Sequence, residues 1–327
     1  MRRFSYIFFV FLLVFSSCKT QQNEDLNLKH AKHIANAINN DLLLVRNNIF
    51  NTANVLQHKI PFDKNVQDFS KNIYRFSLNG TLVSNYIKSK SAIYYPANSI
   101  LTNDLKRIII NSEALDTLFT STIKKNPSLS QIYFIDTNSF LRIYPYIDVL
   151  SYLIPDINLK KFAPYQLANN KPFSEKAYWI NNPIADPYGR GWIVSCVEPI
   201  YYRDHFIGIL SGDITLNSLK EKYFSSGTEL ILIIDQKGNI ICCTKGAGKI
   251  TNIPHLRDFG YYKPITEDIY NFKKTNLTDH KNKSLSNAIK SLLSEESIEN
   301  FYIDNSKYTI YKALIEETNW LLLKIIK

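Results

Sequence analysis

One aromatic segment has the residue types that a binding site needs. Residues 172–192 read PFSEKAYWINNPIADPYGRGW. Three prolines, two glycines and four charged residues surround its aromatic side chains, which include Tyr178, Trp179, Tyr188 and Trp192. A plain surface loop does not need so many aromatic residues, and a core strand does not tolerate so much proline and glycine. Tyrosine and tryptophan combine a large rigid surface with one polar group, which suits contact with a small molecule.

A carboxylate stands at the end of a hydrophobic run further along the chain. Asp213 follows Gly212 in the stretch FIGILSGDITL. A buried carboxylate is stabilised by a cationic partner, so Asp213 is a candidate for pairing with an amine on a ligand. The alternative is that Asp213 caps a helix that begins at NSLKE.

Other chemistries find no support in the sequence. The chain has no Gly-x-Ser-x-Gly, phosphate-binding loop, His-Glu-x-x-His or Cys-x-x-Cys motif, and its six histidines show no metal-ligand spacing. The formal charge of +10 comes from scattered lysines rather than a basic groove. We therefore expect no enzyme activity, no metal, no cofactor and no nucleic-acid partner.

The first residues indicate the compartment. The sequence MRRFSYIFFVFLLVFSSC places two arginines before a short apolar run and two serines before Cys18. It is similar to a bacterial lipoprotein signal, in which residues 1–17 are removed and Cys18 carries acyl chains such as palmitate. The alternative is an ordinary signal peptide with an incidental cysteine. Either case predicts an extracytoplasmic protein, and a lipid anchor places it on the cell envelope, in the periplasm or at the cell surface.

Three further cysteines remain, namely Cys196, Cys242 and Cys243. An odd number in an oxidising compartment does not allow complete internal pairing, and adjacent cysteines rarely bond to each other. The simplest interpretation is that they are buried strand residues that pack as small apolar side chains.

Apolar residues after a polar tether at 19–25 follow a helical period. Their spacing averages about 3.7 residues, and they are Ile34, Ile38, Leu42, Val45, Ile49, Ala53, Leu56 and Ile60. Pro61 ends the pattern. We expect a long helix that acts as a spine for the rest of the chain, and a coiled-coil stalk is a compatible alternative.

The remainder reads as two similar αβ units in tandem. Residues 62–130 look mixed and mostly helical. Hairpin patterns then follow at 130–149 and 191–216, and the pattern restarts with strand, turn and strand at 229–243. A helix at 284–296, a hairpin at 299–314 and a final strand at 319–326 complete the second unit.

This arrangement resembles the double Cache family of extracytoplasmic sensor domains over residues 25–327. The resemblance rests on the long leading helix and on the stretches YFIDTNSFLRIYPY, YWINNPIADPYGRGWIVSCVEPIYYRDHFIGILSGDITL and LIIDQKGNII. It implies an α+β fold with two PAS-like units that have antiparallel sheets. It also implies a tether and spine helix at 18–60, a membrane-distal ligand-binding unit at 61–220 and a membrane-proximal unit at 221–327.

The resemblance further implies that 172–192 wraps a ligand pocket. Members that bind amino acids carry Arg-x-Trp-Tyr in this loop, where this chain has Lys176, Ala177, Tyr178 and Trp179. Lysine lacks the guanidinium fork, so an amine-bearing ligand is better supported than an amino acid specifically. The expected ligand-binding residues are Lys176, Tyr178, Trp179, Asp186, Tyr188, Asp213 and Tyr144.

Several of these residues have a simpler interpretation. Lys176 is alternatively a solvated surface charge, and Asp186 a turn residue before Pro187. Arg142 and Tyr144 are as compatible with packing as with a place in the pocket. The function we expect is a lipid-anchored sensor without its own output domain, which signals through, or delivers its ligand to, a membrane receptor or transporter. The alternative function is a structural or adhesive lipoprotein whose pocket is degenerate.

Overall fold

The computed structural model describes residues 2–59, 73–87, 90–169, 176–186, 188–224, 227–252 and 275–327, with side chains from Gln22 onward except that of Lys59. These residues divide into two compact units. Residues 40–221 make up the unit that we call the sheet A unit. The ranges 2–39, 222–252 and 275–327 make up the sheet B unit.

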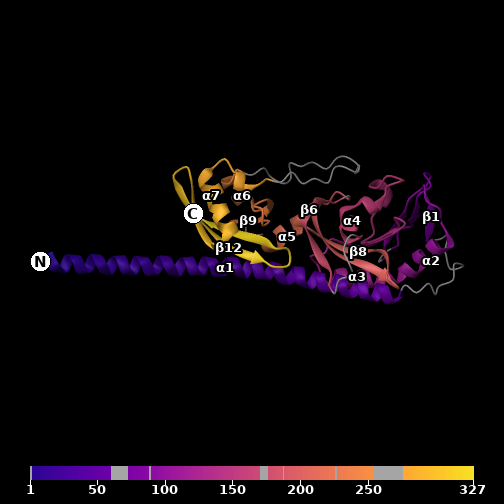
Figure 1. Ribbon diagram of the computed structural model, residues 1–327, viewed down its shortest axis with the longest axis horizontal. Helices are drawn as coiled ribbons and strands as arrows, with labels where there is room; N and C mark the ends of the chain where they lie inside the picture. The colour runs from indigo at the N-terminus through magenta and orange to yellow at the C-terminus, as the bar shows by residue number, and fades with distance from the viewer. Residues whose placement is uncertain are drawn as a thin grey trace. The chain divides into compact units, whose positions relative to one another are not determined.

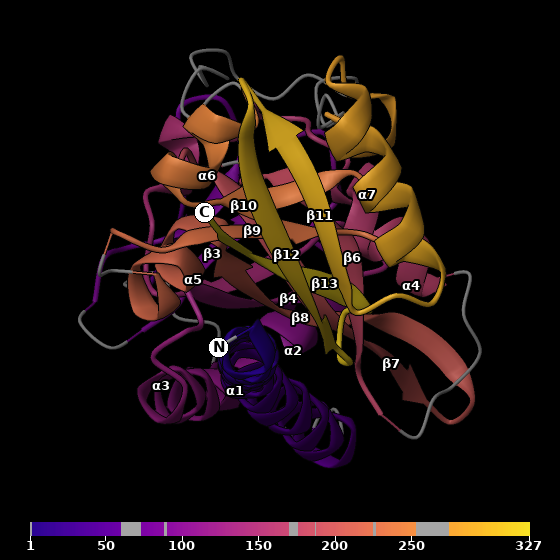
Figure 2. The same ribbon diagram turned by 90° about the vertical axis from the view of Figure 1, so that its left-hand side faces the viewer.

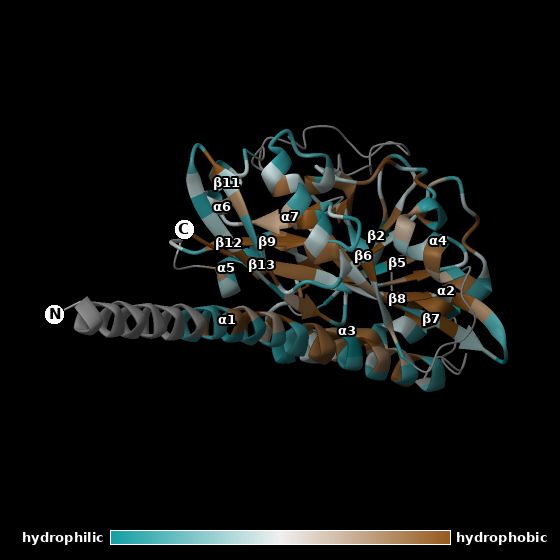
Figure 3. Cartoon of the chain, turned by 60° about the vertical axis from the view of Figure 1, so that its left-hand side comes forward, coloured by the Kyte–Doolittle hydropathy of each residue, from teal (hydrophilic) through white to brown (hydrophobic). Residues whose placement is uncertain are grey.

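The leading helix α1 spans Arg2–Lys59 and contributes residues to both units. Its predicted apolar stripe is confirmed, because every member from Ile34 to Leu56 is at most 7% exposed. Ile60 and Pro61 lie outside the described residues. The stretch 19–25, which we expected to be a tether, is part of the same helix. Figure 3 shows polar and apolar residues alternating along the coloured part of α1.

Sheet A has the strand order β1-β2-β3-β5-β4-β8-β7-β6, and its neighbouring strands are antiparallel. The bounds are Tyr74–Phe76 for β1, Leu82–Ser84 for β2, Ala92–Tyr95 for β3, Gln131–Asp136 for β4, Leu141–Tyr144 for β5, Tyr178–Ala185 for β6, Trp192–Tyr202 for β7 and His205–Thr215 for β8. The predicted hairpins β4–β5 and β7–β8 are confirmed. The expectation of a mostly helical 62–130 was wrong for 74–95, where three short strands extend the sheet.

Two helices cover one face of sheet A, which we call the outer face. They are α3 (Leu115–Lys125) and residues 40–59 of α1, both of which lie beneath β8 in Figure 1. Thr52 of α1 contacts Thr122 of α3 through their hydroxyls at 3.1 Å. A Cβ at Gly212 of β8 would come within 2.6 Å of Ile49 Cδ1, so glycine permits this close approach of helix and strand.

The other face of sheet A, which we call the inner face, packs under the segment between β5 and β6. That segment contains the short helices η3 (Val149–Ser151), η4 (Leu159–Lys161) and α4 (Ala163–Asn169). Leu153, Leu159 and Tyr165 join strand residues there in one buried apolar cluster. The helices α2 (Asn103–Asn111), η2 (Ser112–Ala114) and α5 (Leu216–Tyr223) complete the elements between residues 73 and 224.

Sheet B has the order β10-β9-β13-β12-β11, also antiparallel. Its strands are β9 (Leu230–Ile234), β10 (Ile240–Cys243), β11 (Ile298–Ile303), β12 (Ser306–Ile315) and β13 (Trp320–Ile326). Its helices are α6 (Lys245–Ile250), η6 (Leu277–Asp279) and α7 (Lys283–Ser294). Figure 2 shows α6 and α7 beside this sheet, where they share one apolar core with its strands. The predicted tandem of α+β units with antiparallel sheets is thus confirmed.

Two further observations bear on the expectations from sequence. Cys196 on β7 and Cys242 on β10 are both fully buried in their strands, as packing side chains would be, whereas Cys243 at the end of β10 is only partly buried. Within the part of the chain that the structure describes, no helix is both long and apolar enough to cross a bilayer.

Candidate ligand-binding site

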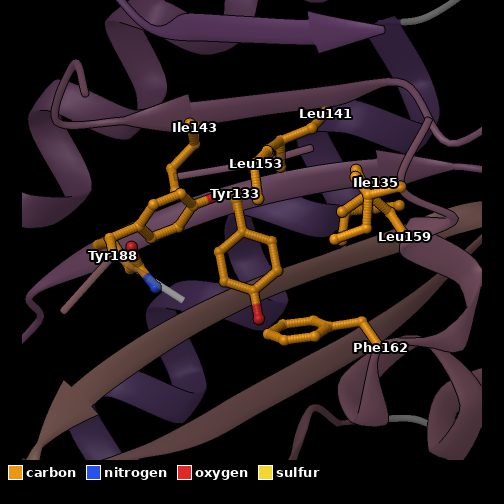
Figure 4. Close-up of a pocket in the computed structure, with 10 residues that line it drawn as sticks. Tyr133, Ile135, Leu141, Ile143, Leu153, Leu159, Phe162 and Tyr188 are labelled. Carbon is orange, nitrogen blue, oxygen red and sulfur yellow. The ribbon is translucent and has the colours of Figure 1, made fainter. Parts of the chain in front are cut away.

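A pocket lies on the inner face of sheet A. It encloses about 370 Å³ between the protein atoms, part of which is open to solvent. Strands β4 and β5 form its floor, and the segment 153–162 and Tyr188 form its walls. Its lining residues are Gln131, Tyr133, Ile135, Leu141, Ile143, Leu153, Ile157, Leu159, Phe162 and Tyr188. Figure 4 shows the Tyr133 ring in the middle of this group, with its hydroxyl beside Phe162.

The lining is apolar except at one end. Side chains two residues apart on a strand share a face, so Gln131, Tyr133 and Ile135 follow one another along the floor. Ile143 lies opposite Tyr133 on β5 and extends the apolar surface. A pocket with this lining suits a small molecule with an apolar body and a polar end.

Asp213 lies at the polar end, next to the pocket. It is fully buried on β8, directly opposite Gln131 on β4. The Gln131 amide donates to its Oδ2, and the Tyr133 hydroxyl donates to its Oδ1 at 3.4 Å. Burial raises the pKa of Asp213 to about 7, although the hydrogen bond from Gln131 acts in the opposite direction.

The structure excludes the helix-cap interpretation of Asp213. Helix α5 begins at Leu216, and the Thr215 hydroxyl accepts the hydrogen bond from the Ser218 backbone N–H at 3.0 Å. The carboxylate of Asp213 instead faces the side chains of β4. Asp213 therefore does not cap α5.

Asp186 and Tyr188 lie in the loop that follows β6. The Asp186 side chain accepts hydrogen bonds from the backbone N–H of Tyr188 at 3.2 Å and of Arg190 at 3.2 Å. Gly189 and Gly191 have φ values of +76° and +97°, which glycine adopts without strain. The turn interpretation of Asp186 is thus correct, and the turn brings Tyr188 to the pocket.

The same loop contains Arg190, which we did not single out from the sequence. Its Nε donates to Asp186 Oδ2 at 2.5 Å, and its guanidinium lies 5.6 Å from the centre of the Tyr188 ring. Gln131, Tyr133 and Phe162 were missed as well. A charged residue between two glycines in an aromatic segment was the available signal for Arg190.

The predicted pairing of Tyr178 and Trp179 in one wall does not hold. Both belong to strand β6 rather than to a loop, and Pro183 falls where the register of this edge strand shifts. Tyr178 pairs with Val197 and packs against the inner-face cluster. Trp179 pairs with Cys196, which lies opposite Gly212, so it belongs to the outer face.

Tyr144 and Arg142 lie on the outer face too. Tyr144 pairs with Ile132, which lies opposite Gly212, the β8 residue that approaches Ile49 of α1. Arg142 is buried and donates to Asp116 at 3.1 Å and to Ser112 at 2.9 Å, which ties β5 to the helices. Packing is therefore the interpretation that the register supports for both.

The remaining candidates lie away from the pocket or outside the description. Lys176 is exposed and is not among the lining residues that the structure describes. The side chain of Cys18 is outside the described residues. Among the described residues, no cluster of histidine, cysteine, aspartate and glutamate is suited to hold a metal ion.

Comparison with known proteins identifies the fold. No family model matches the sequence, and none of the curated proteins matches it. The structure is similar to the sensory domain of the Campylobacter jejuni chemoreceptor Tlp3, with a TM-score of 0.52 and 13% identity over 93% of this chain and 94% of that one. The same domain with isoleucine bound gives 0.51 and 12%, with 93% of each chain covered. The ligand-binding domain of the Pseudomonas aeruginosa chemoreceptor PctB in complex with L-Arg gives 0.50 and 11%, covering 91% of this chain and 90% of that one. These domains are double Cache domains, and the chain has the double Cache fold.

Proposed function

We propose that this protein is an extracytoplasmic sensor that binds a small, amine-bearing molecule on the inner face of sheet A. The observation that carries the proposal is the apolar pocket that ends at Gln131 and Tyr133, with the buried Asp213 behind them. A carboxylate in such surroundings is stabilised by a cationic partner. The ammonium of the ligand takes the place of the Gln131 amide at Asp213. The apolar body of the ligand fills the rest of the pocket.

The lining restricts the class of ligand further. The walls are aliphatic and aromatic, so we infer a compact apolar body such as a branched alkyl chain or a single ring. The similar domains of Tlp3 and PctB were solved with isoleucine and L-Arg respectively. At 11–13% identity, this similarity supports an amino acid or related amine as a proposal for this chain.

We also propose that the two units have different roles. The sheet A unit is membrane-distal and binds the ligand. The sheet B unit is membrane-proximal and passes on the change that ligand binding causes. Cys18 carries the lipid anchor, and the signal or the ligand goes to a membrane receptor or transporter. The motifs MRRFSY and FSSC around the apolar run support the anchor. Equal detergent-phase partitioning of Cys18→Ser and the unaltered protein would contradict a lipid anchor at Cys18.

Thermal unfolding of the full chain with a panel of metabolites tests the binding function. A ligand at 100 times its dissociation constant adds about 2.7 kcal/mol to the free energy of unfolding. We expect apolar amines or amino acids to raise the melting temperature, and their counterparts without the amine to have no effect. Stabilisation by none of the compounds would contradict the proposal and favour a structural or adhesive lipoprotein.

A further inference from the structure

A second cavity lies on the outer face of sheet A, at the edge that β1, β2 and β3 form. It encloses about 300 Å³ between the protein atoms, part of which is open to solvent. Its lining residues are Ile73, Tyr74, Ser84, Asn85, Ile87, Lys90, Ser91, Glu113, Asp116 and Arg142. None of these described residues lines the pocket on the inner face. Arg142 alternates on β5 with Leu141 and Ile143 of that pocket, so the two cavities lie on opposite faces of the sheet.

Four charged side chains line this outer-face cavity. Arg142 is 2% exposed and Asp116 is 4% exposed, and Arg142 Nη1 donates to Asp116 Oδ1 at 3.1 Å. The same guanidinium donates through Nη2 to the Tyr74 hydroxyl at 3.2 Å, and that hydroxyl donates to Glu113 Oε1 at 2.7 Å. Lys90 is exposed, and its Nζ lies 3.3 Å from Asp116 Oδ2. The lining thus has two cationic and two anionic side chains, whose formal charges cancel.

One hydroxyl group in the cavity is not used. Ser91 is 2% exposed, and its Oγ has no hydrogen-bond partner among the described residues. The backbone of Ser91 is fixed, because its N–H donates to Asp116 Oδ1 at 2.9 Å and its carbonyl oxygen accepts from Ser84 Oγ at 3.2 Å. A buried hydroxyl without a partner is unfavourable. Its place in the lining of a cavity indicates a ligand group that completes its hydrogen bonds.

The charges and the unused hydroxyl restrict the class of ligand. A charged ligand would leave one charge uncompensated beside the buried pair of Arg142 and Asp116, which is unfavourable. A hydroxyl group donates and accepts at once, so it can bridge a cationic donor such as Lys90 and a carboxylate such as that of Glu113. The two isoleucines of the lining offer apolar contact to the C–H groups of the same molecule. These features match a small uncharged polyol.

We propose that the outer-face cavity is a second binding site, which takes an uncharged polyol of the size of a monosaccharide. Ser91 and Lys90 donate hydrogen bonds to the hydroxyl groups of the polyol, and Glu113 accepts hydrogen bonds from them. Arg142 holds the frame of the site, because four of its N–H groups donate to protein atoms. The site is independent of the amine site, which lies on the other face of the sheet.

Ligand-observed NMR titration of the full chain at pH 6 tests this assignment. The uncharged probes are D-glucose and D-galactose. Their charged counterparts are D-glucosamine and D-galactosamine, which are cationic, and D-glucuronate and D-galacturonate, which are anionic. We expect at least one uncharged sugar to bind, and to bind at least about tenfold more tightly than both of its charged counterparts. Binding of neither uncharged sugar, or tighter binding of a charged one, would overturn the proposal.

Two substitutions test the location of the site. Ser91→Ala should weaken binding of the preferred sugar about tenfold, since it removes one hydrogen bond. Its melting temperature without ligand should be unchanged or higher, because the hydroxyl has no partner in the free protein. Lys90→Gln leaves the lining with a net negative charge, so the ratio of affinities should shift about threefold toward the cationic sugar.

The matched control is Ser294→Ala, which removes an exposed serine hydroxyl from the sheet B unit. It should keep the affinity of the unaltered protein for the sugar. Unchanged affinity in Ser91→Ala would place the sugar elsewhere and overturn the site. An unchanged ratio of affinities in Lys90→Gln would overturn the role of charge balance in selecting the ligand.

Discussion

The side-chain amide of Gln131 donates a hydrogen bond to Asp213, the residue directly opposite it in the antiparallel pair of β4 and β8. The pair connects the buried acid to the pocket, because Gln131 lines the pocket and Asp213 lies next to it. In the proposed complex, the ligand ammonium replaces the amide as the donor to Asp213. Gln131 can then turn its Oε1, which has no hydrogen-bond partner among the described residues, toward the same ammonium.

The pH dependence of amine affinity tests the ionisation of Asp213. Burial raises its pKa to about 7, so the carboxyl group is mostly neutral at pH 6 and mostly charged at pH 8. Alkylamines remain cationic throughout this range. We expect affinity for 3-methylbutan-1-amine to rise about tenfold from pH 6 to pH 8 by calorimetry. In Asp213→Asn the affinity for the amine should be low and independent of pH. A similar rise of affinity with pH in that variant would refute the role of Asp213 as the ionising group.

Two substitutions, one in the pocket and one on the outer face of sheet A, test ligand affinity and fold stability separately. Tyr188→Ala removes a wall of the pocket and should weaken amine binding about tenfold, with a small change in melting temperature. Trp179→Ala acts on the outer face, where loss of a large buried side chain destabilises the fold by about 3–5 kcal/mol. Its folded fraction should bind the amine about as tightly as the unaltered protein. Loss of affinity in Trp179→Ala equal to that in Tyr188→Ala would place Trp179 in the site after all.

The packing of α1 on sheet A is tested at Ile49. This residue is fully buried beside Gly212, so Ile49→Asp places an unpaired charge in apolar surroundings and should destabilise by more than about 4 kcal/mol. Asn47→Asp lies on the exposed side of the helix and should change stability by about 0.5 kcal/mol or less. Denaturant unfolding measures both. Equal midpoints for the two variants would mean that the helix does not pack on the sheet as described.

A second buried acid gives a pH dependence of stability. Glu198 on β7 is fully buried, and neither of its carboxylate oxygens has a hydrogen-bond partner among the described residues. Burial raises its pKa from 4.5 to about 8. Between these values the folded protein holds a proton that the unfolded chain has lost, so its free energy of unfolding falls as the pH rises.

Glu198→Gln removes this dependence. Relative to the unaltered protein, the variant should gain stability progressively as the pH is raised from 5 to 8, as measured by urea unfolding at each pH. Asp213 and Asp136, whose pKa values burial raises to about 7 and about 6, contribute the same sign in both proteins and cancel in the comparison. Glu221→Gln, at an exposed position, is the control and should show no trend. A constant difference between Glu198→Gln and the unaltered protein would mean that Glu198 is ionised when buried.

Much of the fold was predictable because local chemistry determines it. The stripe on α1 has a regular helical period, and turns such as DTNS and DQKGN separate runs of strand-forming residues. Strands β1 to β3 were not predicted, because each has three or four residues and shows no alternation to recognise. Their strand structure depends on the pairing of β3 with β5, of β2 with β3 and of β1 with β2, and the sequence does not reveal the pairing of β3 with β5.

The candidate site was predictable only in part. Asp213 and Tyr188 were recognisable as a carboxylate and an aromatic residue in unusual surroundings. Tyr178 and Trp179 were wrongly placed together, because the sequence did not show that they belong to an edge strand whose side chains alternate between faces. Gln131 and Tyr133 became apparent only with the β4–β8 register, which depends on contacts between distant parts of the chain.

Calorimetric titration of the full chain and of Asp213→Asn with the amine or amino acid that stabilises it most is the most direct test of the proposed site. Removing one member of a buried charged pair costs about 2–5 kcal/mol, so we predict that the substitution weakens binding about a hundredfold or more. Circular dichroism and thermal unfolding should show that the variant is folded at the temperature of the titration. Unchanged affinity in a folded Asp213→Asn variant would contradict the account and remove Asp213 from the binding site.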